Sequence, residues 1–142
     1  MLFRSRFETW LESAHLEAPN GLTIQGDYLY VGAWGVLEEG FDTKTPGHLK
    51  MVSLRDKSIH SVGPGTPLGN LDGLAPDRDG DFYVSDWMAG KVYHLDRNGA
   101  AKELLALEQG SSDLAYVPDL DLLLVPMMMG NKLMAWKAHA SR

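Results

Sequence analysis

Three side chains at the starts of short apolar segments could together bind a metal ion. Asn20, Asp72 and Asp113 each precede such a segment, and we place all three at one position of a repeated unit. Oxygen atoms that converge at one point are preferred ligands of calcium and magnesium. Asn and Asp at a loop-to-strand junction also accept hydrogen bonds from nearby backbone amides, so a structural role for each of them stays open.

Large apolar side chains at a second repeated position could bind a substrate. Trp34 and Trp87 are equivalent in the repeat, and Met128 is their counterpart further along the chain. Aromatic rings and thioethers suit an apolar binding site, but they also suit packing between sheets, and both alternatives stay open. Strand alternation would send Met127 and Met129 to one face and Met128 to the other.

Other motifs for catalysis or metal binding are weak in this sequence. The segment Asp77–Asp81 begins like a calcium loop, but Phe82 stands where that loop needs glycine, and Met88 stands where it needs glutamate. We therefore interpret it as a hairpin turn. The five histidines lack metal-ligand spacing, and we expect His94 to face solvent or to be a satisfied polar residue between sheets. No Gly-x-Ser-x-Gly motif supports a serine nucleophile.

A repeat of about 41 residues must position these side chains. Asp72–Gly99 has the pattern of three short strands joined by tight turns, with Asp79-Gly80 and Ala89-Gly90 as turn residues. Units of this length are typical of the four-stranded blades of β-propellers. We expect an all-β fold in a single domain, with blades at 16–69, 70–109 and 110–138. The strands expected in these blades are Tyr28–Gly32, Leu74–Ala75, Phe82–Asp86, Lys91–Asp96 and Leu122–Pro126.

Two segments depart from the regular repeat. An insertion within Gly35–Gly47 has the Gly, Pro and acidic content of an exposed loop, and such loops often line binding sites. Met1–Glu12 matches the two outer strands of a preceding blade, although a helix over Ser5–His15 also fits its apolar spacing.

The unequal ends of the repeat suggest that two chains complete each other. The third blade stops after three strands, and an unpaired strand edge invites pairing with another strand. We expect a homodimer in which each chain supplies three blades of one six-bladed ring. Phe7–Leu11 of one chain would supply the fourth strand of the partner's last blade.

Composition narrows the classes of partner. The net charge of −6 makes nucleic acid an unexpected partner, and the absence of cysteine excludes disulfides and thiol catalysis. The first ten residues lack the apolar core of a signal peptide, and the longest apolar run, Leu122–Met129, is too short to span a bilayer. We expect a cytoplasmic protein with no membrane partner.

Two motifs resemble those of the gluconolactonase and senescence-marker-protein (regucalcin) family of six-bladed β-propellers. Glu17-Ala-Pro-Asn20-Gly-Leu precedes Tyr28-Leu-Tyr-Val, and Asn70-Leu-Asp72-Gly-Leu precedes Asp79-Gly-Asp-Phe-Tyr-Val. The similarity covers about residues 16 to 137 and corresponds to the second half of such a protein. It implies that Asn20 and Asp72 are ligands of a divalent metal, which would be calcium, magnesium or zinc. It also implies that Asp72 is the general base of lactone hydrolysis. No segment matches the part of the family's first blade that supplies a further metal-binding glutamate.

The sequence therefore supports two functions of different classes. The leading prediction is a metal-dependent hydrolase of a lactone or small ester, with Asp72 as the catalytic residue. The predicted metal ligands are Asn20, Asp72 and Asp113, and the predicted substrate-binding residues are Trp34, Trp87 and Met128. The alternative is a propeller module that binds a ligand without catalysis, and a truncated product without an independent role is a third possibility.

Overall fold

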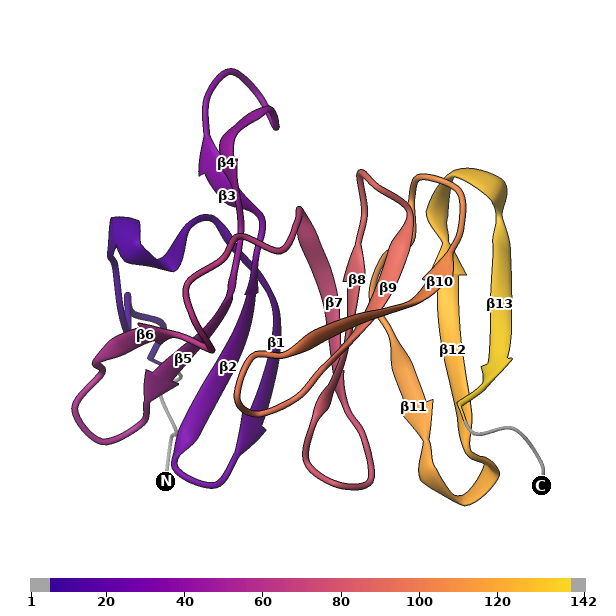
Figure 1. The fold of residues 1–142 in the computed structure, drawn as a ribbon. Helices are drawn as coiled ribbons and strands as arrows, with labels where there is room; N and C mark the ends of the chain where they lie inside the picture. Colours follow the sequence, from indigo (N-terminus) through magenta and orange to yellow (C-terminus); the bar gives the residue numbers. More distant parts are fainter. Residues whose placement is uncertain (1–5, 139–142) are drawn as a thin grey trace.

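The structure is a computed structural model that describes residues 6–138 of the 142-residue chain (Figure 1). Within these residues all regular elements are antiparallel strands and three short 3₁₀ turns, in agreement with the predicted all-β class. No helix of the described part is long and apolar enough to cross a bilayer.

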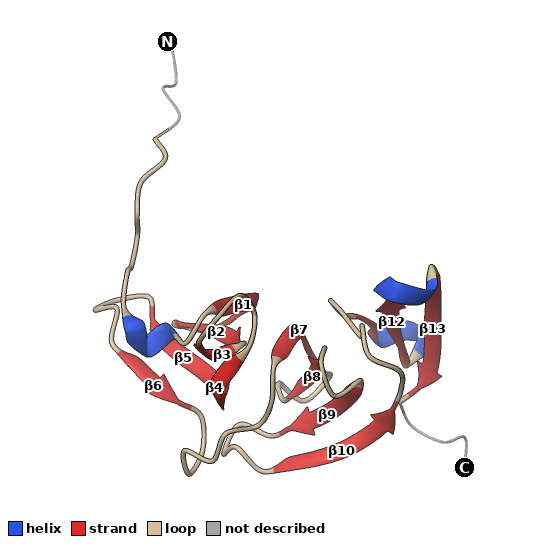
Figure 2. Ribbon diagram, turned by 90° about the horizontal axis from the view of Figure 1, so that it is seen from above, coloured by secondary structure: helices blue, strands red, loops and turns tan. Residues whose placement is uncertain are grey.

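Three sheets follow one another along the chain, and each has its first strand innermost (Figure 2). The first has the order β1 (Pro19–Gln25), β2 (Tyr28–Ala33), β5 (Leu49–Ser53) and β6 (Ile59–Ser61). The second consists of β7 (Leu71–Pro76), β8 (Phe82–Asp86), β9 (Lys91–Leu95) and β10 (Ala101–Ala106). The third contains β11 (Ala115–Val117), β12 (Leu122–Met127) and β13 (Lys132–Lys137). The strands expected from the repeat therefore form, with boundaries within a few residues of those predicted.

The insertion in the first repeat is a hairpin rather than the irregular loop that its composition predicts. Strands β3 (Gly35–Leu37) and β4 (Thr43–Pro46) pair with each other as a separate sheet, which projects beyond the ends of the larger sheets (Figure 1). Gly35 makes this possible because its φ of +136° is unfavourable for other residues. A Cβ atom there would also lie 2.4 Å from the carbonyl oxygen of Thr45.

Glycine allows the innermost strands of neighbouring sheets to pack backbone to backbone. A Cβ atom on Gly21 would lie 2.3 Å from the carbonyl oxygen of Asp72, and one on Gly73 would lie 2.6 Å from the Cα atom of Asp113. The glycine that follows Asn20 and Asp72 in the sequence therefore brings each inner strand against the next one.

Apolar side chains fill the spaces between neighbouring sheets in two clusters. The first joins Tyr30 and Leu49 of the first sheet to Leu74 and Phe82 of the second, and the Tyr30 and Phe82 rings lie 4.6 Å apart. The second cluster joins the second sheet to the third, and its members are Ala75, Tyr83, Val92, Leu114, Leu123, Val125 and Met127. Burial of these apolar surfaces is the main contribution to the stability of the stack.

The described part of the N-terminal segment is neither a strand nor an α-helix in the single chain. Residues 1–5 lie outside the described part, and Arg6–Glu12 has no strand or α-helix and extends away from the sheets (Figure 2). The next element is a 3₁₀ turn, η1 (Ala14–Leu16), which Ser13 caps. Phe7–Leu11 is therefore not a strand in the single chain, and its predicted pairing with the last blade of a partner chain stays a prediction. The helix over Ser5–His15 is also not observed in its described part.

Candidate functional site

A cleft of about 480 Å³ is lined by residues of the β3–β4 hairpin and by residues at the starts of β1 and β7. It contains five of the six residues singled out from the sequence, namely Asn20, Trp34, Asp72, Trp87 and Met128. Sequence reasoning missed the other lining residues, which are Ala18, Pro19, Leu37, Phe41 and Met88. Leu37 and Phe41 belong to the insertion. Large apolar residues in a segment of otherwise loop-like composition were the sequence signal that this segment contributes to a binding site.

Among the described residues, Asp72 is the one ionisable side chain that lines the cleft. Burial raises the pKa of this half-buried carboxyl, and the negative charge of Asp113 raises it further. A hydrogen bond with the Asn20 side chain acts in the opposite direction because it stabilises the charged form. Within residues 6–138, no Lys, Arg or His forms an ion pair with Asp72.

Strand register places Asp113 differently from the sequence prediction. Leu71 pairs with Asp86, and Ser111 pairs with Met127 at the corresponding place in the next sheet. The residue equivalent to Asp72 is therefore Ser112, and Asp113 lies one position later, where the first two repeats have glycine. Asp113 is exposed, does not line the cleft and accepts a hydrogen bond from the Leu114 amide at 2.9 Å. It contributes to the site through its charge on Asp72.

A buried serine connects the inner strands below the cleft. The hydroxyl of Ser85 accepts a hydrogen bond from the Gly73 amide at 2.8 Å and donates one to the carbonyl oxygen of Ser112 at 2.5 Å. Because Gly73 directly follows Asp72, this bridge helps to set the position of the carboxylate.

Aromatic rings form one wall of the cleft. The rings of Trp34 and Trp87 lie 6.2 Å apart, and Phe41 makes an edge contact with Trp34 at the same separation. The indole nitrogen of Trp34 donates a hydrogen bond to the carbonyl oxygen of Phe41 at 2.8 Å, which joins the hairpin to the cleft. The two tryptophans thus line the cleft and also contact each other across neighbouring sheets.

The methionines near the cleft separate at the end of a strand. Met127 is buried, whereas Met128 and Met129 are exposed in a 3₁₀ turn, η3 (Met128–Gly130). The prediction that Met127 and Met129 share a face is wrong, because β12 ends at Met127 and strand alternation ends with it.

A network of charged side chains holds the chain segment that carries Asn20. The Glu17 carboxylate lies 2.7 Å from Nδ1 of His48 and 3.3 Å from Nζ of the buried Lys50. Glu17 and Ala18 both have left-handed backbone conformations, with φ of 55°. Their carbonyl oxygens accept hydrogen bonds from the amides of Gly35 and Trp34. Glu17 therefore connects the segment before β1 to the backbone at Gly35 and to the side chains of His48 and Lys50.

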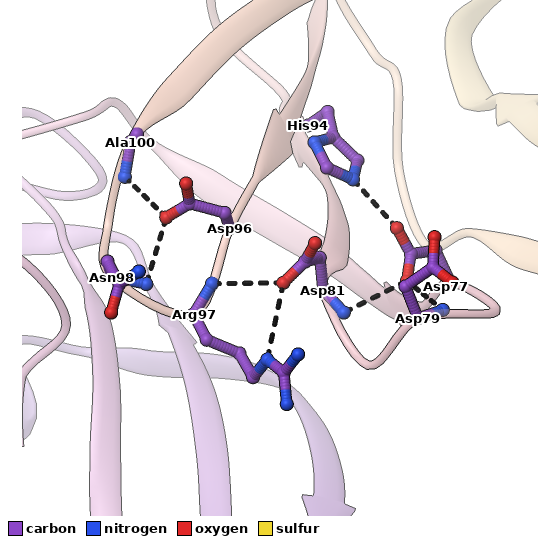
Figure 3. Close-up of polar contacts among 8 residues, drawn as sticks. All are labelled: Asp77, Asp79, Asp81, His94, Asp96, Arg97, Asn98 and Ala100. Carbon is purple, nitrogen blue, oxygen red and sulfur yellow. Dashed lines mark hydrogen bonds and ion pairs between the residues drawn. The ribbon is translucent and has the colours of Figure 1, made fainter.

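A second group of polar side chains lies on the second sheet (Figure 3). Oδ1 of Asp77 accepts hydrogen bonds from the amides of Asp79 and Asp81, and Oδ2 lies 2.7 Å from Nε2 of His94. The predicted hairpin turn is confirmed, and His94 is a satisfied polar residue. Burial alone would raise the pKa of Asp77, but these hydrogen bonds and the charge of His94 outweigh it and lower the pKa.

The same group is a possible metal-binding cluster in the described residues. One ligand atom each from Asp77, Asp81 and His94 lies within 4.8 Å of the others. Asp81 already accepts a hydrogen bond from the Arg97 amide at 3.1 Å, and its carboxylate lies 3.5 Å from the Arg97 guanidinium (Figure 3). The sequence did not reveal this cluster, because His94 and Asp77 are far apart in the chain and meet through pairing of β8 with β9.

No protein-family model and no curated protein sequence matches the chain. Among solved structures it is similar to virginiamycin B lyase from Staphylococcus aureus, with a TM-score of 0.60 and 16% identity. It is also similar to an auxiliary nutrient binding protein from Bacteroides thetaiotaomicron VPI-5482, with a TM-score of 0.61 and 12% identity. A streptogramin B lyase structure is also similar, with a TM-score of 0.51 and 13% identity. The chain has a β-propeller fold.

These comparisons cover most of this chain but only part of the other proteins. The similarity to the lyase from Staphylococcus aureus includes 85% of this chain and 41% of the lyase. The similarity to the nutrient binding protein includes 83% of this chain and 31% of that protein. The similarity to the streptogramin B lyase includes 84% of this chain and 54% of that lyase. At these identities the comparisons show the fold alone, and they do not single out the gluconolactonase and regucalcin family.

Proposed function

We propose that the cleft binds a small, largely apolar molecule and that Asp72 interacts with its polar end. The observation that carries this proposal is the meeting of Asn20, Asp72, Trp34, Trp87 and Met128 in one cleft. A concave apolar surface with a few polar groups at one place is typical of small-molecule sites. A carboxyl with a perturbed pKa in such a cleft is a candidate for chemistry.

The reaction that we propose is hydrolysis of a lactone or small ester. Asp72 would accept a proton from the water that attacks the carbonyl carbon, and its raised pKa makes it a better proton acceptor than an exposed aspartate. The acyl C–O bond of the substrate would then break, and the departing alkoxide would take the proton from Asp72. The apolar walls would exclude other water and hold the rest of the substrate. Asn20 would orient the carboxylate through its hydrogen bond.

The same residues fit a divalent cation in the proposal. Asn20 and Asp72 line the cleft and offer oxygen atoms, whereas Asp113 would contribute only the nearby negative charge. The Asp72 carboxylate has no cationic partner in the described part of the chain. Hard ions such as calcium or magnesium match this donor set. When bound, a divalent ion would polarise the carbonyl group of the substrate.

Exposure of equivalent leucines supports a ring closed by a second copy of the chain. Leu74 and Leu114 are 5% and 8% exposed, whereas Leu22, at the same repeat position in the first sheet, is 58% exposed. On the opposite face of the stack, Leu133 is 75% exposed, although its equivalents Leu49 and Val92 are buried. We propose that a partner's third sheet covers Leu22 and that its first sheet covers Leu133, in a homodimer with six blades.

A non-catalytic binding module is the second candidate. A cleft with almost entirely apolar walls needs no reaction to retain a ligand, and one of the similar structures is a nutrient binding protein. In this case the chain would retain its ligand unchanged, and Asp72 would contribute only orientation.

Hydrolysis and metal titration separate these functions. We would measure hydrolysis of γ-butyrolactone and phenyl acetate, and would titrate calcium, magnesium, manganese and zinc by calorimetry. Loss of a general base lowers rates by about 10²–10⁴-fold, so we expect that loss for Asp72→Asn. The control Asp27→Asn changes an exposed carboxylate paired with Arg55 and should match wild type. If wild type binds no ion and hydrolyses neither substrate, the hydrolase proposal is wrong and the binding module replaces it.

A further inference from the structure

The β3–β4 hairpin adds to the cleft a wall that the regular repeat would not provide. Leu37 and Phe41 are hairpin residues that line the cleft, and Phe41 is 80% exposed. An exposed phenylalanine in contact with an apolar cleft leaves one side of its ring free for another molecule. Exposed apolar surface of this kind marks binding sites.

The backbone around Phe41 is held in place, which keeps the wall at a fixed position. The Trp34 indole donates to the carbonyl oxygen of Phe41, so the indole N–H is not available to a ligand. The side-chain amide nitrogen of Asn70 donates hydrogen bonds to the carbonyl oxygen of Trp34 at 3.0 Å and to the Thr43 hydroxyl at 3.1 Å. These bonds connect the hairpin to the start of β7 and leave the ring faces of the wall for contact.

The charge distribution restricts the ligand further. Asp72 is the only ionisable lining residue, and the Asp113 charge acts on it. An anionic ligand in this cleft would meet like charges without a compensating cation among the lining residues. Flat rings, in contrast, gain favourable stacked or edge contacts with tryptophan and phenylalanine.

We propose that the β3–β4 hairpin makes the cleft selective for molecules with a flat aromatic ring and that Asp72 disfavours those with a negative charge, so that Phe41 is a specificity-determining residue. This inference rests on the proposed small-molecule site and names the class of molecule that the site prefers. For the proposed hydrolase, the substrate would be an ester or lactone that carries an aryl group.

Three probes of similar size test the selectivity by NMR titration of the labelled chain. Benzyl alcohol is flat and uncharged, cyclohexylmethanol is uncharged but not flat, and benzoate is flat and anionic. The indole N–H signals of Trp34 and Trp87 report on the cleft, and those of Trp10 and Trp136 are internal controls because these residues do not line it. We expect benzyl alcohol to bind about two- to tenfold more tightly than cyclohexylmethanol, in line with the size of aromatic pair contacts. Benzoate should bind more weakly than benzyl alcohol.

Phe41→Leu keeps an apolar side chain but removes the ring. It should weaken benzyl alcohol about two- to tenfold and leave cyclohexylmethanol within about twofold of wild type. Phe7→Leu changes a fully exposed phenylalanine away from the cleft and should leave all three affinities unchanged. Equal binding of the two alcohols, or wild-type affinity in Phe41→Leu, would overturn the inference. Hydrolysis of γ-butyrolactone would still report separately on the proposed function.

Discussion

At the scale of single residues, Asp72 of the cleft and Asp77 of the second polar group have oppositely shifted pKa values. Asp72 is desolvated beside Asp113, and its pKa is raised. Asp77 is also desolvated, but it accepts three hydrogen bonds, and its pKa is lowered. Because both residues are aspartates, the difference between their pKa values comes from their hydrogen-bond partners and neighbouring charges.

The negative charge of Asp113 contributes to the raised pKa of Asp72, so Asp113→Asn should change the pH at which Asp72 titrates. Removing the charge of Asp113 should lower the Asp72 pKa, although burial should keep it above the ordinary value of 3.8. In wild type the protonated form of Asp72 is favoured by folding. Its stabilising contribution is therefore complete below the unfolded pKa and is lost as pH rises through the folded pKa. NMR titration of the Asp72 carboxyl carbon measures the change, and an unchanged midpoint in Asp113→Asn would exclude the coupling.

Asp77→Asn should destabilise the fold at neutral pH, because an amide replaces the charged acceptor of the His94 hydrogen bond. The expected cost is about 1.5–3 kcal/mol, as for loss of a hydrogen bond to a charged group. Because the folded pKa of Asp77 is lowered, its contribution is present above 3.8 and is lost as pH falls through the folded pKa. Urea unfolding of both proteins between pH 7 and pH 3 should therefore show a decreasing difference.

Asp96→Asn is a matched control for this experiment. Asp96 accepts hydrogen bonds from the amides of Asn98 and Ala100 in a similar turn, without a histidine (Figure 3). Asparagine can accept both bonds, so we expect stability within about 0.5 kcal/mol of wild type. An equal loss in both variants would show that His94 contributes nothing.

At the scale of elements, close contact between inner strands sets the geometry of the cleft. Gly21 and Gly73 allow the backbone that carries Asn20 and Asp72 to approach the next sheet. The hairpin then closes one side of the cleft above these strands. The regular repeat and its one irregular insertion thus contribute different parts of the same site.

Gly73→Ala tests the contact between inner strands. The added methyl group would lie 2.6 Å from the Cα atom of Asp113 and from the carbonyl oxygen of Ser112, so these backbones must separate. Overpacking of this kind typically costs about 1–3 kcal/mol, which a thermal or urea unfolding curve would show. Gly130→Ala is the control, because its new methyl group would meet only the flexible Lys132 side chain at 3.4 Å or more. A fully stable Gly73→Ala protein would contradict the proposed packing.

At the scale of the whole molecule, the two end faces of the stack remain apolar. Leu22 and Leu133 are exposed at positions whose equivalents are buried between sheets. Surface of this kind favours association with a complementary face. The proposed homodimer places these two faces together.

Charged substitutions on either end face should therefore convert a dimer into monomers. We expect wild type at twice the chain mass of 15.7 kDa in light scattering, and Leu22→Asp and Leu133→Asp near the single mass. The control Leu54→Asp changes an exposed leucine in the turn that follows β5 and should remain dimeric. Removal of Met1–Glu12 tests the separate proposal that Phe7–Leu11 pairs with the partner's last sheet. A wild-type monomer at micromolar concentration would refute the dimer.

The sequence by itself determined the repeat, the strands and half of the residues that line the cleft. Period-2 apolar patterns and Asp-Gly turns are local signals, so β2, β8, β9 and β12 could be predicted from neighbouring residues alone. The positions of Trp34, Trp87 and Asp72 followed from the repeat, because equivalent residues of stacked units lie at the same end of each sheet.

Tertiary structure alone decided the rest, because it depends on contacts between residues distant in the chain. The strand register shows that Ser112, and not Asp113, is equivalent to Asp72. Pairing of β8 with β9 brings His94 into hydrogen-bond contact with Asp77. The composition of the insertion indicated only a loop. The hydrogen bond from Trp34 to Phe41 holds this segment as a wall of the cleft. Leu22 and Leu133 have the same apolar character as their buried equivalents, and only the absence of a neighbouring sheet in the single chain exposes them.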